Sequence, residues 1–299
     1  MVRPMGDVTI VGAPTSAGAY APGQEDGPRA LRDAGLPAAL EAGGARVTDA
    51  GDVEPFRWAP DPDRPQAANA AAVGERARQV AERVAAAPRD GRVLVLGGDC
   101  TVGVGTVAGL AARGGEPGLV YFDRHADLNI PASTIDGALD WMGVAHLLDL
   151  DGATDELAGF GAARPLLAPE RLAYLGLGPA SKFEREQMAR HGIREVGLGA
   201  TMADPEGAAR SALELLGGSE EIAVHFDVDV LDYLDAPLAE NTDRAPGVLL
   251  ERAAHVLAAL LADPRVRAVT VTEFNPHHGD GATARRLAEA LAGAFAQTS

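Results

Sequence analysis

The stretch Tyr121-Phe122-Asp123-Arg124-His125-Ala126-Asp127-Leu128-Asn129 gives the first indication of both fold and chemistry. The apolar run 118–122 predicts a buried strand, and the chain leaves it through Asp-x-His-x-Asp. Side chains alternate across a strand, so residues at spacing two can point the same way where the chain leaves the sheet. Two carboxylates and an imidazole that converge on one point are suited to hold a divalent cation.

The same pattern of a short apolar run followed by polar residues recurs along the chain. Helical composition separates most of these runs, for example at 27–40 and 67–87. Strands that alternate with helices predict one mainly parallel sheet of about eight strands in an α/β fold. The predicted strands cover residues 8–12, 46–51, 92–96, 118–122, 172–177, 195–198, 222–226 and 266–272.

Composition limits the classes of protein and partner. The 299 residues hold no polar linker that would divide them, so one domain over residues 1–299 is expected. There is no apolar run long enough to cross a membrane and no secretory signal, and the single cysteine excludes an internal disulfide, which together favour the cytoplasm. A net charge of -17 argues against nucleic acid as a partner.

Ligands bind at the carboxyl ends of the strands in such sheets, and three further strand ends carry chemistry. They are Asp99-Cys100, Asp227-Val228-Asp229 and Thr272-Glu273. Taken with the first stretch, they supply enough aspartates, with one histidine and one cysteine, for two metals that share bridging carboxylates and leave a position for water.

In order and spacing, these strand ends resemble the signatures of the arginase/agmatinase (ureohydrolase) family. The N-terminal Val11-Gly12-Ala13-Pro14 and the Gly23-x-x-x-Gly27-Pro28 that follows are also similar to the family's opening. The resemblance covers nearly the whole chain. It implies a three-layer α/β sandwich with eight parallel strands, and a two-manganese centre that hydrolyses the C–N bonds of linear amidines. The four matching motifs are Gly97-Gly98-Asp99, Asp123-x-His125-x-Asp127, Phe226-Asp227-Val228-Asp229-x-x-Asp232 and Glu273-Phe274-Asn275-Pro276.

The resemblance also implies a role for each matching residue. Asp123 and Asp227 would bridge the two metals. Asp127 would orient the bridging hydroxide that attacks the guanidino carbon, and would take its proton. Glu273 would hold the guanidine-type group of the substrate. The ligand set divides between the two metals, with Asp127 and Cys100 completing one site and His125 and Asp229 completing the other.

Cys100 is the first departure from the family, which has histidine after Gly-Gly-Asp. A thiolate adds a negative charge where imidazole is neutral, so the centre should be a weaker Lewis acid and its bound water less acidic. Thiolate also suits softer ions than Mn²⁺, although Mn²⁺ remains the metal that the resemblance implies.

Asp140 is the second departure, because arginases have there a histidine that carries a proton to the leaving amine. An aspartate cannot readily do this unless its pKa is raised. His146, His277 and His278 are possible substitutes, since they lie near the motifs in the sequence.

Both departures favour a substrate less basic than L-arginine. They are similar to family members of D-cycloserine biosynthesis that hydrolyse Nω-hydroxy-L-arginine to hydroxyurea and L-ornithine. That antibiotic-pathway reaction is the one expected here, with L-arginine or another guanidino or amidino compound as the alternative. Asn129 and Glu184 match arginase residues near the α-carboxylate and the α-amino group. Asp136 could meet the substrate ammonium or could be a solvated loop residue.

Two other classes of function stay open at this stage. Cys100 could be a nucleophile paired with a histidine, as in amidino-transferring enzymes. Alternatively, the chain could be a former ureohydrolase that keeps its metals for a structural or regulatory purpose. The sequence leaves the oligomeric state open.

Overall fold

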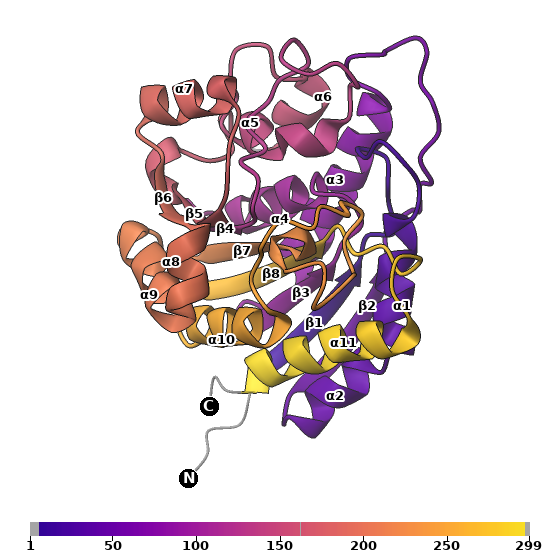
Figure 1. The fold of residues 1–299 in the computed structure, drawn as a ribbon, viewed down its shortest axis with the longest axis vertical. Helices are drawn as coiled ribbons and strands as arrows, with labels where there is room; N and C mark the ends of the chain where they lie inside the picture. Colours follow the sequence, from indigo (N-terminus) through magenta and orange to yellow (C-terminus); the bar gives the residue numbers. More distant parts are fainter. Residues whose placement is uncertain (1–5, 162, 297–299) are drawn as a thin grey trace.

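The computed structural model describes residues 6–161 and 163–296. These residues form one eight-stranded sheet with the strand order β2-β1-β3-β8-β7-β4-β5-β6, in which each neighbouring pair of strands is parallel. The predicted α/β fold with a parallel eight-stranded sheet is therefore confirmed (Figure 1). The strands are β1 (Asp7–Gly12), β2 (Arg46–Asp52), β3 (Arg92–Leu96), β4 (Gly118–Phe122), β5 (Leu172–Leu177), β6 (Arg194–Gly197), β7 (Ile222–Asp227) and β8 (Val266–Thr272).

The central strands are apolar because each is covered on both faces. In β4, Val120 and Phe122 pack into the core beneath one helical layer, whereas Leu119 and Tyr121 pack into the core beneath the other. An apolar run without alternation is the pattern of a parallel strand buried on both sides. The edge strand β2, by contrast, is mostly exposed.

Two helical layers sandwich the sheet (Figure 1). One layer packs on the core that contains Val120 and comprises α1 (Gly27–Asp33), α2 (Leu36–Ala42), α8 (Leu198–Ala203), α9 (Pro205–Leu215), α10 (Leu250–Leu261) and α11 (Gly281–Ala296). The other comprises α3 (Ala70–Ala86), α4 (Val102–Ala111), α5 (Gly143–Leu147), α6 (Asp155–Ala158) and α7 (Lys182–His191). Short 3-10 turns complete the description: η1 (Gln24–Asp26), η2 (Leu139–Met142), η3 (Pro169–Arg171) and η4 (Val228–Val230).

The four motifs follow the four central strands β3, β8, β7 and β4, which are neighbours in the sheet. The chain passes from β3 to β4 across the positions that β8 and β7 later fill. This crossing is the topological switch at which open α/β sheets bind ligands. Sheet order therefore brings together motifs that are far apart in sequence.

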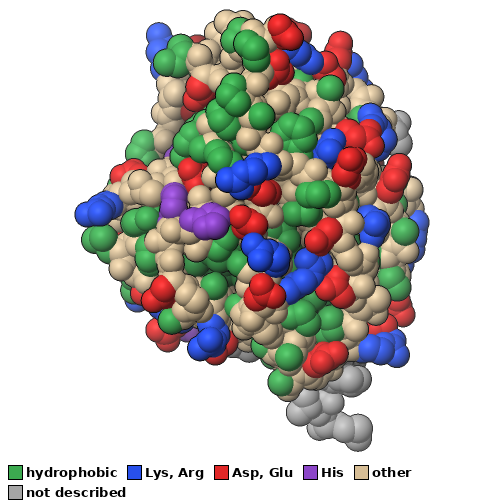
Figure 2. Space-filling model, turned by 90° about the vertical axis from the view of Figure 1, so that its right-hand side faces the viewer, with side chains coloured by type: hydrophobic (Ala, Val, Ile, Leu, Met, Phe, Trp, Pro, Cys, Tyr) green, Lys and Arg blue, Asp and Glu red, His purple; other side chains and the backbone are tan. Residues whose placement is uncertain are grey.

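Charged side chains of both signs are mixed with apolar ones on the face shown in Figure 2. At the β2 edge, for example, Arg32 binds the carboxylates of Asp49 (Nε–Oδ2 2.7 Å) and Asp52 (Nη1–Oδ1 2.7 Å). Within the described part of the chain, no helix combines the length and hydropathy that a membrane crossing requires.

Candidate metal centre and active site

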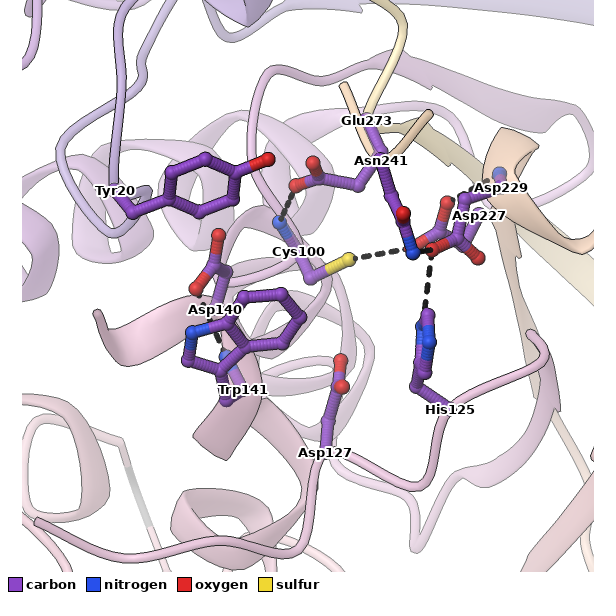
Figure 3. A pocket seen from close by; sticks show the side chains of 10 residues that line it. All are labelled: Tyr20, Cys100, His125, Asp127, Asp140, Trp141, Asp227, Asp229, Asn241 and Glu273. Carbon is purple, nitrogen blue, oxygen red and sulfur yellow. Dashed lines mark hydrogen bonds and ion pairs between the residues drawn. The ribbon is translucent and has the colours of Figure 1, made fainter. Parts of the chain in front are cut away.

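A small cavity opens at the carboxyl ends of the central strands. Cys100 lies in its middle with the sulfur directed toward Asp227, while Tyr20, Asp140 and Trp141 form one side and His125 lies on the other (Figure 3). The full lining consists of Tyr20, Cys100, His125, Asp127, Asp140, Trp141, Asp227, Asp229, Asn241 and Glu273.

Asp123 and Asp227 organise the site through the same local turn. The backbone N–H of His125 donates to Asp123 Oδ1 (2.6 Å), and the backbone N–H of Asp229 donates to Asp227 Oδ1 (2.7 Å). Each bond is a side-chain-to-backbone turn that brings the residue two positions later back toward the aspartate. The residues at spacing two do converge, but by these turns rather than by strand alternation, because β4 has already ended at Phe122.

Two groups of side chains are close enough to hold a cation. In the first, Asp123, His125 and Asp229 offer donor atoms that all lie within 4.8 Å of one another. His125 Nδ1 is 2.9 Å from Asp229 Oδ2 and 3.6 Å from Asp123 Oδ1. In the second, Cys100, Asp123 and Asp227 are joined by His225, with Cys100 Sγ 3.0 Å from Asp227 Oδ2.

Asp127 lines the cavity without belonging to either group. Its backbone is left-handed (φ 47°), and its carbonyl accepts from the N–H groups of Val144 and Ala145. Its Oδ2 accepts a hydrogen bond from the buried hydroxyl of Tyr121 (2.5 Å). These hydrogen bonds hold the Asp127 carboxylate in place. The Asp127 backbone adopts a conformation that costs free energy in residues other than glycine.

Glu273 is held in a similar way. It too has a left-handed backbone (φ 63°), fixed by the bond from its N–H to the Gly98 carbonyl (2.8 Å). Its Oε1 accepts from the backbone N–H of Cys100 (3.1 Å), and its Oε2 accepts from Gln24 Nε2 (3.2 Å). The loop after β8 is thus fastened to the loop after β3, and the acid faces the cavity.

The buried carboxylates of the site would be stabilised as anions by added positive charge. Burial, reinforced by neighbouring carboxylates, raises the pKa of Asp123, Asp227 and Glu273 well above the usual range. Burial is also the main reason that the pKa of Asp127 rises to about 7. Buried carboxylates in such numbers are stable as anions only beside cations, so they are protonated unless metals replace the protons.

His125 and Asp229 form the exception, because they form an ion pair. Burial opposes a charge on His125, yet the Asp229 carboxylate outweighs it and raises the pKa of the imidazole to about 9. Burial likewise opposes a charge on Asp229, but His125 and the nearby Arg124 reverse the effect and lower its pKa. Arg124 lies under the site, where its Nη1 is 3.4 Å from the Asp229 carbonyl oxygen.

Asp140 is buried in the cavity wall, and its environment raises its pKa, as proton transfer by an aspartate requires. Burial, followed by the charge of Glu273, raises the pKa of Asp140 well above the usual range. Its backbone N–H donates to the Gly18 carbonyl (3.1 Å). Burial therefore favours the neutral form of this carboxyl group, at a position where the family resemblance implies histidine.

The three histidines named as possible substitutes do not line this cavity. His146 is buried elsewhere with Nδ1 2.6 Å from the Met142 carbonyl oxygen. His277 is on the surface beside Asp26, and His278 Nδ1 lies 2.8 Å from the Ala239 carbonyl oxygen.

Of the expected substrate contacts, Glu273 lines the cavity, whereas Asn129, Asp136 and Glu184 are not part of its lining. Asn129 Nδ2 donates to Glu184 Oε1 (3.0 Å), and Glu184 also caps α7 together with Ser181. Asp136 is an exposed loop residue whose Oδ2 accepts from the indole N–H of Trp141 (3.2 Å). These three residues are therefore engaged with protein groups in this structure.

Sequence reasoning missed several residues of the site. Tyr20 and Trp141 stack on each other at the cavity wall (centroids 5.9 Å apart, planes 4° apart), and only the folded chain brings them together. Asn241 Nδ2 donates to Asp229 Oδ2 (3.3 Å). Tyr121 carried a signal, since it precedes Asp123 at spacing two on the same strand.

The interpretation of Cys100 as a nucleophile finds little support in this environment. Burial, with the charge of Asp227 next, raises the pKa of the Cys100 thiol well above its usual range. Nucleophilic cysteines occupy electropositive, partly exposed surroundings, whereas this thiol is buried among carboxylates. A thiolate here needs a metal ion beside it.

Comparison with known proteins agrees with this geometry. The model of the arginase family matches residues 6–296. Human arginase-1 is 31% identical over 280 residues, covering 91% of this chain and 86% of that protein. Among solved structures, Entamoeba histolytica arginase in complex with L-ornithine superposes with a TM-score of 0.87 at 21% identity, covering 98% and 99% of the two chains. Proclavaminate amidino hydrolase of Streptomyces clavuligerus gives a TM-score of 0.71 at 23% identity, covering 99% and 93%.

The fold and the site define a hydrolase that acts on C–N bonds of linear amidines. The chain belongs to the arginase family. That family uses a binuclear metal centre, and the two groups of buried acidic, imidazole and thiol side chains fit such a centre.

Proposed function

We propose that this protein hydrolyses Nω-hydroxy-L-arginine to hydroxyurea and L-ornithine. Water adds to the guanidino carbon, the bond from that carbon to Nδ breaks, and Nδ leaves as the amine of ornithine after gaining a proton. Two divalent cations, Mn²⁺ being the first candidate, would be held by Cys100, Asp123, His125, Asp127, Asp227 and Asp229. Once bound, such cations supply a hydroxide near neutral pH and offset the negative charge of their ligands.

Glu273 is the residue we assign to the substrate's guanidine-type group. Its carboxylate is anchored by Gln24 and the Cys100 N–H, so it faces the cavity in a fixed position. A fixed anion orients a planar cationic group by hydrogen bonds that charge strengthens. Asp127, held by Tyr121, is placed to accept the proton of the attacking water.

Asp140 carries the argument for this substrate. It lies in the cavity wall, where burial favours its neutral form, and it stands where the family resemblance implies a histidine, which is charged more readily. An N-hydroxyguanidine is nearer to neutrality than the guanidinium of L-arginine, so its departing amine needs less assistance. The thiolate of Cys100 adds negative charge to the centre, and this also favours a substrate that is less basic than L-arginine.

The test is turnover of the metal-loaded protein on Nω-hydroxy-L-arginine and L-arginine side by side, with L-ornithine, hydroxyurea and urea measured as products. We expect the higher kcat/KM on the hydroxylated substrate. Faster turnover of L-arginine would remove this assignment. Metal-loaded protein that turns over no guanidine at all would instead favour a binding or regulatory role.

A second candidate, another guanidino or amidino compound, is favoured by the residues outside the cavity. Asn129 and Glu184 are hydrogen-bonded to each other, and the stacked rings of Tyr20 and Trp141 form part of the cavity wall. A substrate without the amino-acid end would not need the first pair. Adding N-hydroxyguanidine to the same assay tests this candidate, because its kcat/KM would then exceed that of the full-length amino acid.

A further inference from the structure

His225 is a buried imidazole to which the proposed reaction gives no role. It is 1% exposed and lies two residues before Asp227 in β7, on the same face of the sheet. Its ring stacks on Tyr121 (centroids 4.2 Å apart, planes 4° apart), and a Cβ on Gly103 of α4 would approach Nδ1 to 2.5 Å. Among the described residues, Nδ1 finds no hydrogen-bond partner. That atom faces α4, whereas Nε2 on the other side of the ring is directed toward Thr272, and a buried imidazole in this position requires an explanation.

The surroundings of His225 supply one. A ring nitrogen of His225, Cys100 Sγ and one carboxylate oxygen each from Asp123 and Asp227 all lie within 4.8 Å of one another. Asp123 is completely buried, and its Oδ2 also has no hydrogen-bond partner among the described residues. Four donors from three strand ends thus face one point, and two of these residues carry unpartnered buried atoms.

Asp127, which the family resemblance would place in this site, lines the same cavity but lies outside this compact group. It is absent from this group of donors, and its Oδ2 accepts the Tyr121 hydroxyl. Thr272 lies instead beside the group, with Oγ1 3.1 Å from His225 Nε2 and 3.6 Å from Cys100 Sγ. One hydroxyl therefore contacts both the nitrogen and the sulfur donor and fixes their separation.

The two groups of donors differ in chemical softness. Cys100, His225 and two carboxylates form a mixed S, N and O set of the kind that binds Zn²⁺, whose tetrahedral donors lie roughly 3.5 Å apart. Asp123, His125 and Asp229 offer no sulfur and suit a harder ion such as Mn²⁺.

We propose that His225 is a metal ligand and that, with Cys100, Asp123 and Asp227, it forms a deeper site that selects a thiophilic ion of the Zn²⁺ type. The outer site takes the harder ion, so the centre is built for two different metals. The proposal concerns metal selectivity alone and is independent of which guanidine is hydrolysed.

The experiment is zinc-edge X-ray absorption on metal-free protein given one equivalent of Zn²⁺, without substrate. We expect one sulfur and one imidazole around the zinc. His225→Phe, which keeps an aromatic ring against Tyr121, should remove the imidazole and weaken zinc binding about tenfold or more. The matched variant His125→Asn should retain both the sulfur and the imidazole.

Loss of the imidazole in His125→Asn, or its persistence in His225→Phe, would overturn the proposal. The His125→Asn result decides the question even if His225→Phe does not fold. A second measurement is metal content after loading with equal Zn²⁺ and Mn²⁺. One zinc and one manganese per chain is expected, whereas two ions of the same element would contradict the division into a soft and a hard site.

Discussion

At the scale of single residues, Asp140 is one of the two positions where the chain departs from the pattern that the family resemblance implies. The acid is buried, so replacing it by asparagine keeps the shape and removes the proton. We expect Asp140→Asn to lower kcat on Nω-hydroxy-L-arginine by about 100-fold, the range of a lost general acid, with a smaller change in KM. Steady-state kinetics at neutral pH measure both.

Asp140→His gives the complementary result. An imidazole at this position should raise the ratio of L-arginine turnover to Nω-hydroxy-L-arginine turnover, because it can be charged near neutral pH. Asp90→Asn, an equivalent change on the exposed surface, is the control. An unchanged kcat in Asp140→Asn would show that the proton comes from elsewhere.

Tyr121 positions another acid of the site, Asp127, through a hydrogen bond to its carboxylate. Tyr121→Phe removes one oxygen and leaves Asp127 Oδ2 without its buried donor (2.5 Å). Hydrogen bonds to charged groups contribute about 1.5–3 kcal/mol, so kcat should fall by about 10- to 100-fold if that bond orients the acid. The measurement is kcat of metal-saturated protein.

Tyr174 offers a matched control for that variant. It is equally buried, but its hydroxyl donates to the Ala126 carbonyl instead of a cavity carboxylate. Tyr174→Phe should therefore cost similar stability and leave kcat within a few-fold. Equal losses of kcat in the two variants would mean that Tyr121 acts only through general packing.

At the scale of elements, α3 and α4 pack closely because glycines face the contact. A Cβ on Gly105 would approach the Ala77 carbonyl oxygen to 2.5 Å, and one on Gly109 would meet Val84 Cβ at 2.6 Å. Alanine is otherwise the better helix former, by about 1 kcal/mol. Here we expect Gly105→Ala to destabilise the protein by about 1–3 kcal/mol, because an added methyl overpacks the contact.

Gly293 in α11 provides the comparison, since a Cβ there meets nothing within 4 Å. Gly293→Ala should stabilise the protein by up to about 1 kcal/mol. Denaturant unfolding of both variants gives the two free energies. Stabilisation by Gly105→Ala would show that the helices can separate at little cost.

The elements were also the part that the sequence predicted best. β4 is apolar throughout and β7 is apolar apart from His225 and Asp227, because both faces of each strand are buried, so composition located them. The motifs at their ends could be read because Asp and His are expensive to bury without a purpose. Local pattern therefore located strands and ligands together.

What the sequence could not supply depends on pairs that only the fold creates. Tyr20 and Trp141 are 121 positions apart and have no local pattern that joins them. The engagement of Asn129 with Glu184 depends likewise on where α7 begins. His225 could have been noticed, since alternation in β7 places it on the face of Asp227, but a buried histidine in an apolar strand is usually a packing residue.

At the scale of the whole molecule, the buried acids make stability depend on pH and metal. The pKa of His125 rises from 6.5 to about 9 on folding, so its contribution is complete below pH 6.5 and is lost as the pH rises through 9. The carboxylates whose pKa is raised by folding also lose their stabilising contribution as the pH rises above 3.8. For Asp127, whose pKa rises to about 7, this loss extends to about pH 7. His225, whose pKa falls to about 3, acts oppositely, but its contribution no longer changes above pH 6.5.

Metal-free protein should therefore lose thermal stability between pH 6.5 and 9, because protons that the folded state binds more tightly are being removed. Divalent cations occupy the places of those protons and bind more tightly as the pH rises. Tm measured with chelator should fall across this range, whereas Tm with saturating Mn²⁺ or Zn²⁺ should stay level or rise. His125→Asn should flatten the metal-free slope at its upper end. A metal-free Tm that rises with pH would mean that the cavity acids are already ionised in the folded protein.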